Sequence, residues 1–376
     1  MVREGQKRSL NISMDLAHKG QNLLGYKTLN LLNSHEDPSF LRTVLYSRIA
    51  REYLPAPKAN LVHLVINGES WGIYSNVQQF DKEFVKVNFG SKSGTRWKVQ
   101  GSPNGRCTLE YLGPDPQVYR KVYQIKSKES KEVWMRLIEM TRVLNQTPSV
   151  DLKERLEPLL DVDGALRFLA LENVLINNDG YWIRASDYSL LLDDKGRIHL
   201  VSYDMNEGFS RPGGSGFGGG GGRPGGRRGP PGTLGEGRLP GSPEFEPNQP
   251  TLGRPPTREL GPGGKSRIEG VKLDPLFAVT DVSKPLISRM LAIDEYRLKY
   301  LRYVREIAEK SLDWQHLGPI AERLHKAIGP IVRSDGRKLD SNEEFESSLK
   351  LDVSFGSAIS IRRFADERRA FIMGTE

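Results

Sequence analysis

The sequence of 376 residues predicts an α+β fold with a β-rich N-terminal lobe, residues 1–125, followed by a mainly helical lobe, residues 126–376. Short apolar runs with alternating polarity and turn residues fill the first lobe, whereas apolar residues at helical spacing fill most of the second. A Gly/Pro-rich stretch at 211–265 interrupts the helical lobe, and we expect it to be disordered.

The first predicted elements are two strands and a helix. KRSLNISMDL (7–16) and YKTLNLLN (26–33) have the composition of strands. Asp37 and the proline after it form the pattern of a helix start, and FLRTVLYSRIAREYL (40–54) carries apolar residues at helical spacing. Pro55 is predicted to end this helix.

A β-hairpin is predicted at 61–81, LVHLVINGESWGIYSNVQQFD, because Asn67-Gly68 between alternating apolar runs is a strong turn signal. Gly72 lies inside the second strand, where a glycine weakens the strand unless a ligand or backbone comes close. A hairpin with glycines at its tip can lie over nucleotide phosphates. A plain turn with a packing glycine is the simpler interpretation.

Lys98 lies in the next predicted strand, TRWKV (95–99), after a short helix that Asp81 can cap. A strand lysine near a phosphate site can pair with it as a point charge, although a lone lysine is usually only solvated.

Amphipathic or apolar patterns predict helices along much of the second lobe. The helix at 161–177 is the more apolar and leads into an acidic loop. We expect the charges of the last helix to form a solvated face. The predicted helical segments are 129–146, 161–177, 275–312, 316–332 and the stretch that ends IRRFADERRAFIMG.

Three aspartates can converge within residues 171–209. Asp179 lies in the loop after the apolar helix, Asp187 stands where a strand begins, and Asp204 follows the end of the next strand. The turn DDKG (193–196) predicts a hairpin, which brings its outer ends together. Carboxylates that meet repel one another, so a cation lies among them or one holds a proton. Mg²⁺, with phosphates completing its coordination, suits such a site.

The order of these residues matches phosphoryl transfer. In protein kinases one aspartate takes the proton of the acceptor hydroxyl, and a later polar residue and a second aspartate hold the metal ions. The order here is acid, polar ligand, hairpin, acid. Three solvated loop carboxylates are the alternative, since Asp is common in loops.

Composition narrows the classes of function. The net charge of +8 favours an anionic ligand or partner but does not identify it. The single Cys107 rules out an intrachain disulfide framework and a Cys-based zinc site. No apolar run has the length of a membrane span and no signal peptide opens the chain, so the sequence as written predicts a cytoplasmic protein. A truncated start would leave an exported or cell-surface location open.

The 211–265 stretch holds 19 Gly and 11 Pro, and its 8 Lys/Arg against 4 Glu give it a net charge of +4. Its tract RPGGRRGPPG (223–232) is similar to RNA-binding arginine-glycine segments. We favour a tolerated flexible insertion, and nucleic-acid binding through this stretch is the alternative.

Taken together, the ordered motifs resemble the CotH kinase family, which is named for a bacterial spore coat protein. The resemblance covers nearly the whole chain outside the insertion. The motifs that carry it are LVHLVINGESWGIYSNVQQFD, TRWKV, NNDGYW, SDYSLLL, VSYDMNEGF, PLISRML, YRLKYL and IRRFADERR. The resemblance implies an atypical protein-kinase-like fold of two lobes.

The resemblance also implies roles for single residues. Asp179 resembles the catalytic aspartate, Asp204 the metal-binding aspartate, and Lys98 the lysine that contacts ATP. Gly68 and Gly72 resemble the glycines of a hairpin that covers the nucleotide.

The chain departs from the family pattern at three places. Gln78 stands where the family often has Glu, and Gln cannot form an ion pair with Lys98. Asp187 stands where the family usually has Asn; Asp still binds metal and adds a negative charge. A strand and small-residue motif that commonly open the family are missing here.

We therefore expect transfer of the γ-phosphate of ATP to a Ser or Thr hydroxyl of a protein, with Mg²⁺, or Mn²⁺ as a second candidate. Asp179 would deprotonate the acceptor, Asp204 and Asp187 would hold the metal, and Lys98 would neutralise phosphate charge. Three alternatives remain: a pseudokinase that binds nucleotide and assembles a coat, a nucleic-acid binder, and a Mg²⁺-dependent phosphohydrolase.

Overall fold

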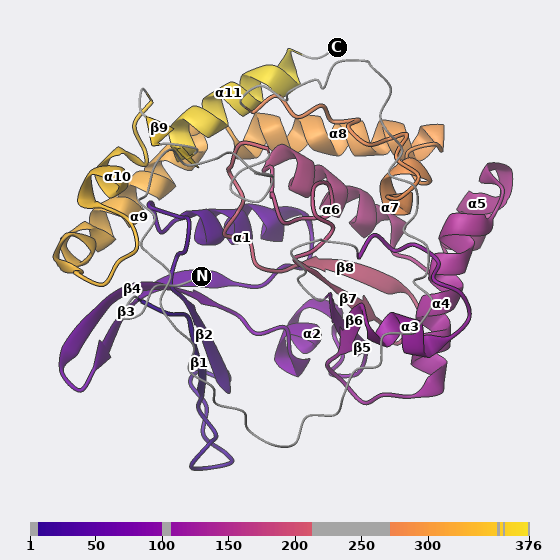
Figure 1. Cartoon of the computed structure of the whole chain (residues 1–376), viewed down its shortest axis with the longest axis horizontal. Helices are drawn as coiled ribbons and strands as arrows, with labels where there is room; N and C mark the ends of the chain where they lie inside the picture. Colours follow the sequence, from indigo (N-terminus) through magenta and orange to yellow (C-terminus); the bar gives the residue numbers. More distant parts are fainter. Residues whose placement is uncertain (1–6, 100–106, 213–270, 352–353, 356–357, 375–376) are drawn as a thin grey trace, which may run out of the picture. The chain divides into compact units, whose positions relative to one another are not determined.

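The computed structural model describes residues 7–99, 107–212, 271–351, 354–355 and 358–374 (Figure 1). The predicted disorder of 211–265 therefore lies outside the described residues, apart from Arg211 and Pro212. The described residues on the two sides of that stretch belong to one compact unit. This unit contains both helices and sheets, which confirms the predicted α+β class.

The first sheet is antiparallel and has the strand order β1-β2-β4-β3. The turn between β3 and β4 is formed by Asn67 and Gly68, whose φ angles of +52° and +81° confirm the predicted hairpin. Helix α1 lies along β3 (Figure 1). The bounds are β1 Leu10–Ser13, β2 Thr28–Leu32, α1 Arg42–Tyr53, β3 Ala59–Ile66 and β4 Glu69–Val77.

The second sheet, also antiparallel, has the order β6-β5-β7-β8 and carries the predicted site. Helix α2 covers one face, where Phe84 and Val85 pack on Leu191 and Val201. Helix α6 contacts β8. Strands from both sides of residue 125 pair in this sheet, and the boundary between two lobes stays a prediction. The bounds are α2 Lys82–Phe89, β5 Thr95–Val99, β6 Tyr123–Ile125, α6 Val162–Val174, β7 Tyr188–Leu192 and β8 Ile198–Ser202.

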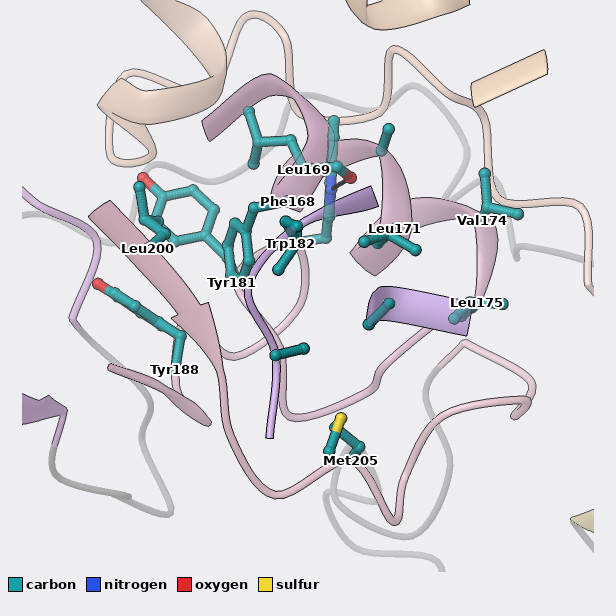
Figure 2. Close-up of a cluster of buried hydrophobic side chains, with 14 of the residues drawn as sticks. Phe168, Leu169, Leu171, Val174, Leu175, Tyr181, Trp182, Tyr188, Leu200 and Met205 are labelled. Atoms are coloured by element: carbon teal, nitrogen blue, oxygen red, sulfur yellow. Dashed lines mark hydrogen bonds between the residues drawn. The ribbon is translucent and has the colours of Figure 1, made fainter. Parts of the chain in front are cut away.

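Helix α6 is the centre of the main core, as its apolar composition predicts. Figure 2 shows Phe168, Leu169 and Leu171 of this helix packed among Trp182 and Tyr188. The indole nitrogen of Trp182 donates to the carbonyl oxygen of Leu169 at 2.7 Å, and this bond ties the loop after α6 back onto the helix. The loop after α6, which carries Asp179, is therefore held against the packed core.

The remaining elements are mostly helices. Helix α8 packs against both α6 and α11, and helix α9 contacts β4. The bounds are α3 Pro116–Arg120, α4 Lys131–Gln146, α5 Ser149–Leu156, α7 Pro285–Ser288, α8 Asp294–Ser311, α9 Trp314–Ser334, α10 Asn342–Ser347, β9 Ser354–Phe355, β10 Ala358–Ile359 and α11 Ile361–Met373. In the part of the chain that the structure describes, no helix has the length and hydropathy needed to cross a bilayer.

Three sequence predictions need correction. Helix α1 begins at Arg42 rather than next to Pro38, because Asp37 instead closes a tight turn and accepts the amide of Arg42 at 2.9 Å. The segment 275–312 is not one helix: turns and the short α7 precede α8. The last helix does not have only solvated charges, because Arg368 is fully buried and binds carbonyl oxygens at the end of α6.

Candidate active site

The hairpin of β7 and β8 brings two predicted site residues together. Asp187 directly precedes β7, and Asp204 lies two residues after β8. The amide of Tyr203 donates to the carbonyl oxygen of Asp187 at 3.0 Å, which continues the pairing beyond the strands. Asp187 and Asp204 have φ angles of +55° and +47°, which are uncommon for residues other than glycine and mark a constrained backbone.

The loop after α6 brings Asp179 to the same place. The amide and hydroxyl of Ser186 both donate to the carbonyl oxygen of Asp179, at 3.0 and 2.7 Å. The amide of Phe209 donates to Leu175 at 2.7 Å and fastens the chain beyond Asp204 to the end of α6. The loop after α6, which carries Asp179, and the loop after β8, which carries Asp204, thus meet. We call these two loops the acidic loops, and the place where Asp179, Asp187 and Asp204 meet the acidic site.

The charges of the three aspartates affect one another's ionisation. Burial raises the pKa of Asp187 well above its ordinary value, and the charges of Asp204 and Asp179 raise it further. Burial also raises the pKa of Asp204; the positive charge of Lys98 opposes this shift, and the negative charge of Asp179 adds to it. These carboxyl groups therefore resist ionising together, and a cation would relieve the repulsion.

Lys98 lies beside Asp204 in this site. Its ammonium group is 4.0 Å from the ring centre of Tyr203, the neighbour of Asp204. A cavity of about 30 Å³ is lined by Asp204 and Tyr203, and also by Asn30 of β2 and Val77 of β4. The first sheet thus reaches the acidic site through β2 and the end of β4.

Arg184 and Glu207 also belong to the site, and neither was predicted from the sequence. Arg184 forms an ion pair with Asp179 and lies 3.9 Å from the carboxylate of Glu207. Burial raises the pKa of Glu207 to about 8, and the charge and hydrogen bond of Asp179 contribute, although Arg184 opposes the shift. The available signal was a second acid three residues after Asp204, in the run DMNEGF.

Glu172 is a third missed residue and lies under the site within α6. It is 1% exposed, and burial raises its pKa to about 7 although three hydrogen bonds oppose the shift. It accepts the Tyr46 hydroxyl at 2.5 Å and the amide of Tyr181 at 3.2 Å. An acid in the mostly apolar run LALENVL was the signal that could have found it.

The structure places Gly72 beside Asp335 and Gly68 in the turn of the hairpin, and their nucleotide role stays a prediction. A Cβ atom at Gly72 would lie 1.9 Å from the carboxylate of Asp335, and Gly68 lies at the turn with open space around it. Gln78 lies at the end of β4, where its side-chain oxygen accepts the amide of Lys58 at 3.2 Å. Gln78 thus bonds to backbone, and its nucleotide role stays a prediction.

The donor set can be compared with the needs of a metal ion. Among the described residues, no group of three or more His, Cys, Asp or Glu side chains is placed to hold a metal. Asp187 and Asp204 offer two carboxylates, and Mg²⁺ in phosphoryl-transfer enzymes is commonly bound by one or two carboxylates together with substrate phosphates. The two carboxylates are within the number of protein ligands that such an ion takes.

Comparison with known proteins agrees with the motifs. The chain is 22% identical over 212 residues to inner spore coat protein H of Bacillus subtilis, covering 56% of this chain and 57% of that protein. It is 26% identical over 196 residues to the inner spore coat protein H-like protein of the same organism, covering 52% and 51%. Invasin CotH3 of Rhizopus delemar is 23% identical over 199 residues, covering 50% of this chain and 33% of that protein. The alignments thus span about half the length of the two bacterial relatives.

The sequence model described as CotH kinase protein matches residues 1–372. The match includes both loops of the acidic site and the helices after the insertion. It therefore covers nearly the whole chain, and this chain belongs to the CotH kinase protein family.

Proposed function

We propose that this chain is a phosphotransferase that moves the γ-phosphate of ATP to a Ser or Thr hydroxyl of a protein. One observation supports the proposal above the others: Asp187 and Asp204 are largely buried carboxyls whose charges repel, and Lys98 lies beside Asp204. A buried acidic pair next to an ammonium group suits a metal-bound polyphosphate, which carries both signs of charge.

Each residue of the site would have its own role in such a reaction. Asp204 and Asp187 would hold Mg²⁺, or Mn²⁺, and the ion when bound neutralises charge on the transferring phosphate. Lys98 would add its positive charge to the phosphates. Asp179 would orient the acceptor hydroxyl and accept its proton. Positioning and electrostatic stabilisation provide most of the catalysis in phosphoryl transfer, so little other chemistry is required of the protein.

Arg184 has a defined place in this scheme. Its guanidinium group pairs with Asp179 and lies near Glu207, and it limits the repulsion around the proposed base. At neutral pH Glu207 holds a proton, since its pKa is about 8.

The test is incubation of the purified protein with γ-labelled ATP, with and without Mg²⁺ or Mn²⁺, beside Asp204→Ala and Asp179→Ala. Metal-dependent label on the protein or on an added basic Ser-rich peptide, absent in both variants, is the expected result. Substantial label in either variant would overturn the assignment. Phosphate release without any labelled acceptor would identify a phosphohydrolase instead.

A second candidate function is that of a nucleotide-binding assembly protein without turnover. Gln78 favours it, because the residue cannot form an ion pair with Lys98 and instead bonds to the backbone of Lys58. Two of the relatives are named as spore coat proteins, and a coat or surface role is the matching proposal for this chain. A thermal shift on adding ATP, with no label transferred, would support this candidate over the first.

A further inference from the structure

Tyr46 and Glu172 occupy a buried position under the acidic site, and the proposed reaction assigns them no chemistry. Tyr46 is fully buried in α1 and Glu172 is 1% exposed in α6. Their side chains are joined by the hydrogen bond of 2.5 Å from the Tyr46 hydroxyl. A buried carboxyl group is costly unless it is hydrogen-bonded, and such groups are kept where they specify an arrangement.

Glu172 fixes the loop that carries Asp179. Its carboxylate accepts the amide of Tyr181 at 3.2 Å and the side-chain amide of Asn177 at 3.4 Å, one on each side of Asp179. A Cβ atom at Gly180 would lie 1.6 Å from the Glu172 carboxylate. The loop thus passes directly over Glu172, and only glycine allows this distance.

Tyr46 reaches the other loop, which carries Asp204 and Glu207. A Cβ atom at Gly208 would lie 2.7 Å from the Tyr46 ring. The same ring therefore packs against Gly208 while its hydroxyl binds Glu172. The two loops also meet directly, because the amide of Asn178 points to the carbonyl oxygen of Glu207 at 3.5 Å.

We propose that Tyr46 and Glu172 are positioning residues that set the separation between Asp179 and Asp204. The inference rests on the proposed function, since the spacing matters only if Asp179 and Asp204 act on one substrate. Neither residue touches the reacting atoms. A displacement of reacting groups by about 1 Å lowers rates by roughly 100-fold in other enzymes, so a small shift of either loop would be measurable.

The experiment compares Tyr46→Phe with Tyr53→Phe. Both variants lose one tyrosine hydroxyl from α1, but the Tyr53 hydroxyl bonds to Ser311 at 2.9 Å, away from the acidic loops. We expect Tyr46→Phe to lower kcat by about tenfold while KM for ATP changes less than about twofold, because Lys98 is untouched. Tyr53→Phe should keep both parameters. Equal losses of kcat in the two variants would contradict the proposal, because they would show that Tyr46 only stabilises the fold.

Glu172→Gln provides the second variant. The side-chain oxygen of the introduced Gln can still accept the hydrogen bond of the Tyr46 hydroxyl. Its NH₂ group, however, faces the backbone N–H of Tyr181, and two donors cannot form a hydrogen bond. We therefore expect a larger loss of kcat than in Tyr46→Phe. Wild-type kcat in Glu172→Gln would overturn the proposal.

Amide hydrogen exchange separates this inference from the proposed function, because it requires no turnover. We expect faster exchange in 177–182 and 204–209 together in both Tyr46→Phe and Glu172→Gln, and no change in Tyr53→Phe. If the wild type transfers no phosphate but these loops loosen together, the proposed function fails and the coupling of the loops stands. Unchanged exchange in both loops would refute the coupling itself.

Discussion

Asp187 is held in an unfavourable state when no cation neutralises its surroundings. Its folded pKa is raised, so the ionised form opposes folding, and stability is lost as pH rises from the ordinary Asp range toward the raised value. Asp187→Asn should therefore raise Tm at pH 7 by about 2 °C, or more, in metal-free buffer, and the gain should vanish in acid. Asp294→Asn is the control, since that side chain is 81% exposed. An equal or lower Tm for Asp187→Asn in chelator would contradict the expectation.

We expect Glu207 to set the alkaline limb of the pH–rate profile of phosphoryl transfer. With a pKa of about 8 it is protonated at neutral pH and ionises above it, which places a second charge beside Asp179. We expect transfer activity to fall as pH rises through about 8, because the new charge repels both the base and the phosphates. Glu207→Gln should keep activity near pH 7 and lose this fall. An unchanged alkaline limb in the pH–rate profile of the variant would show that another group titrates there.

The sequence indicated that acids at the ends of a predicted hairpin would meet, but it gave no indication of contacts between side chains on separate helices. Asp187 and Asp204 flank a hairpin that turn chemistry predicts, so their meeting could be argued from spacing. Glu172 and Tyr46 lie 126 residues apart and meet only because α1 packs near α6. No local pattern encodes that contact, although an acid in an apolar helix could have been marked.

At the scale of elements, His199 joins three of them. It lies on β8, and its ring nitrogens bond at 2.9 Å to Asp161, the N-cap of α6, and to Asp193 in the β7–β8 turn. Burial lowers the pKa of His199, but the two hydrogen bonds and the charges of the carboxylates outweigh it and the pKa is raised. Phe89 of α2 packs edge-on against the ring. The His199 ring therefore connects β8, the start of α6 and the turn.

This arrangement predicts a pH-dependent stability. The contribution of His199 is full below the ordinary His pKa of about 6.5 and is lost as pH rises through the raised folded value. The pKa values of Asp161 and Asp193 are lowered, although burial opposes this, so their contribution is lost only in acid. We expect the Tm of the wild type to fall as pH rises from about 6.5 through the raised folded pKa of His199, and the Tm of His199→Gln to vary less with pH. His316→Gln, at a side chain that is 77% exposed, should keep the wild-type slope.

Element boundaries were predicted well where the local signals agree. Asp81 caps α2 by accepting the amides of Glu83 and Phe84, and β5 has the predicted bounds Thr95–Val99. Prediction failed where a side chain closed a turn before a helix. Asp37 did so ahead of α1, and Asp281 accepts the amide of Ser283 in the turns before α7. The capping residues were visible, but which turn each would close depends on packing.

At the scale of the whole molecule, the N-terminal segment and the C-terminal helices meet at a buried ion pair. The ammonium group of Lys7 lies 2.9 Å from the carboxylate of Asp335 just after α9, and the two side chains are 0% and 1% exposed. Lys7 also donates to the carbonyl oxygen of Ile73 at 2.6 Å, next to Gly72. The glycine expected to cover a nucleotide thus makes room for this pair. Spacing along the chain could not show this, because Lys7 and Asp335 are 328 residues apart.

The ion pair yields a prediction for stability. Asp335→Ala leaves Lys7 buried without its counter-charge, and losing one partner of a buried pair costs about 3–5 kcal/mol. We expect a loss of that order in denaturant unfolding, whereas Arg333→Ala should cost under about 1 kcal/mol, because Arg333 is 53% exposed in its pair with Glu346.

The double variant Lys7→Met with Asp335→Leu distinguishes a structural pair from a functional one. It removes both charges and fills the space, so it should recover most of the stability that Asp335→Ala loses. Because the pair contacts Gly72 and Ile73 rather than the acidic loops, phosphoryl transfer should recover with the fold. A stable double variant that binds ATP poorly would instead show that the β3–β4 hairpin serves the nucleotide, as the resemblance to the family implied for Gly68 and Gly72.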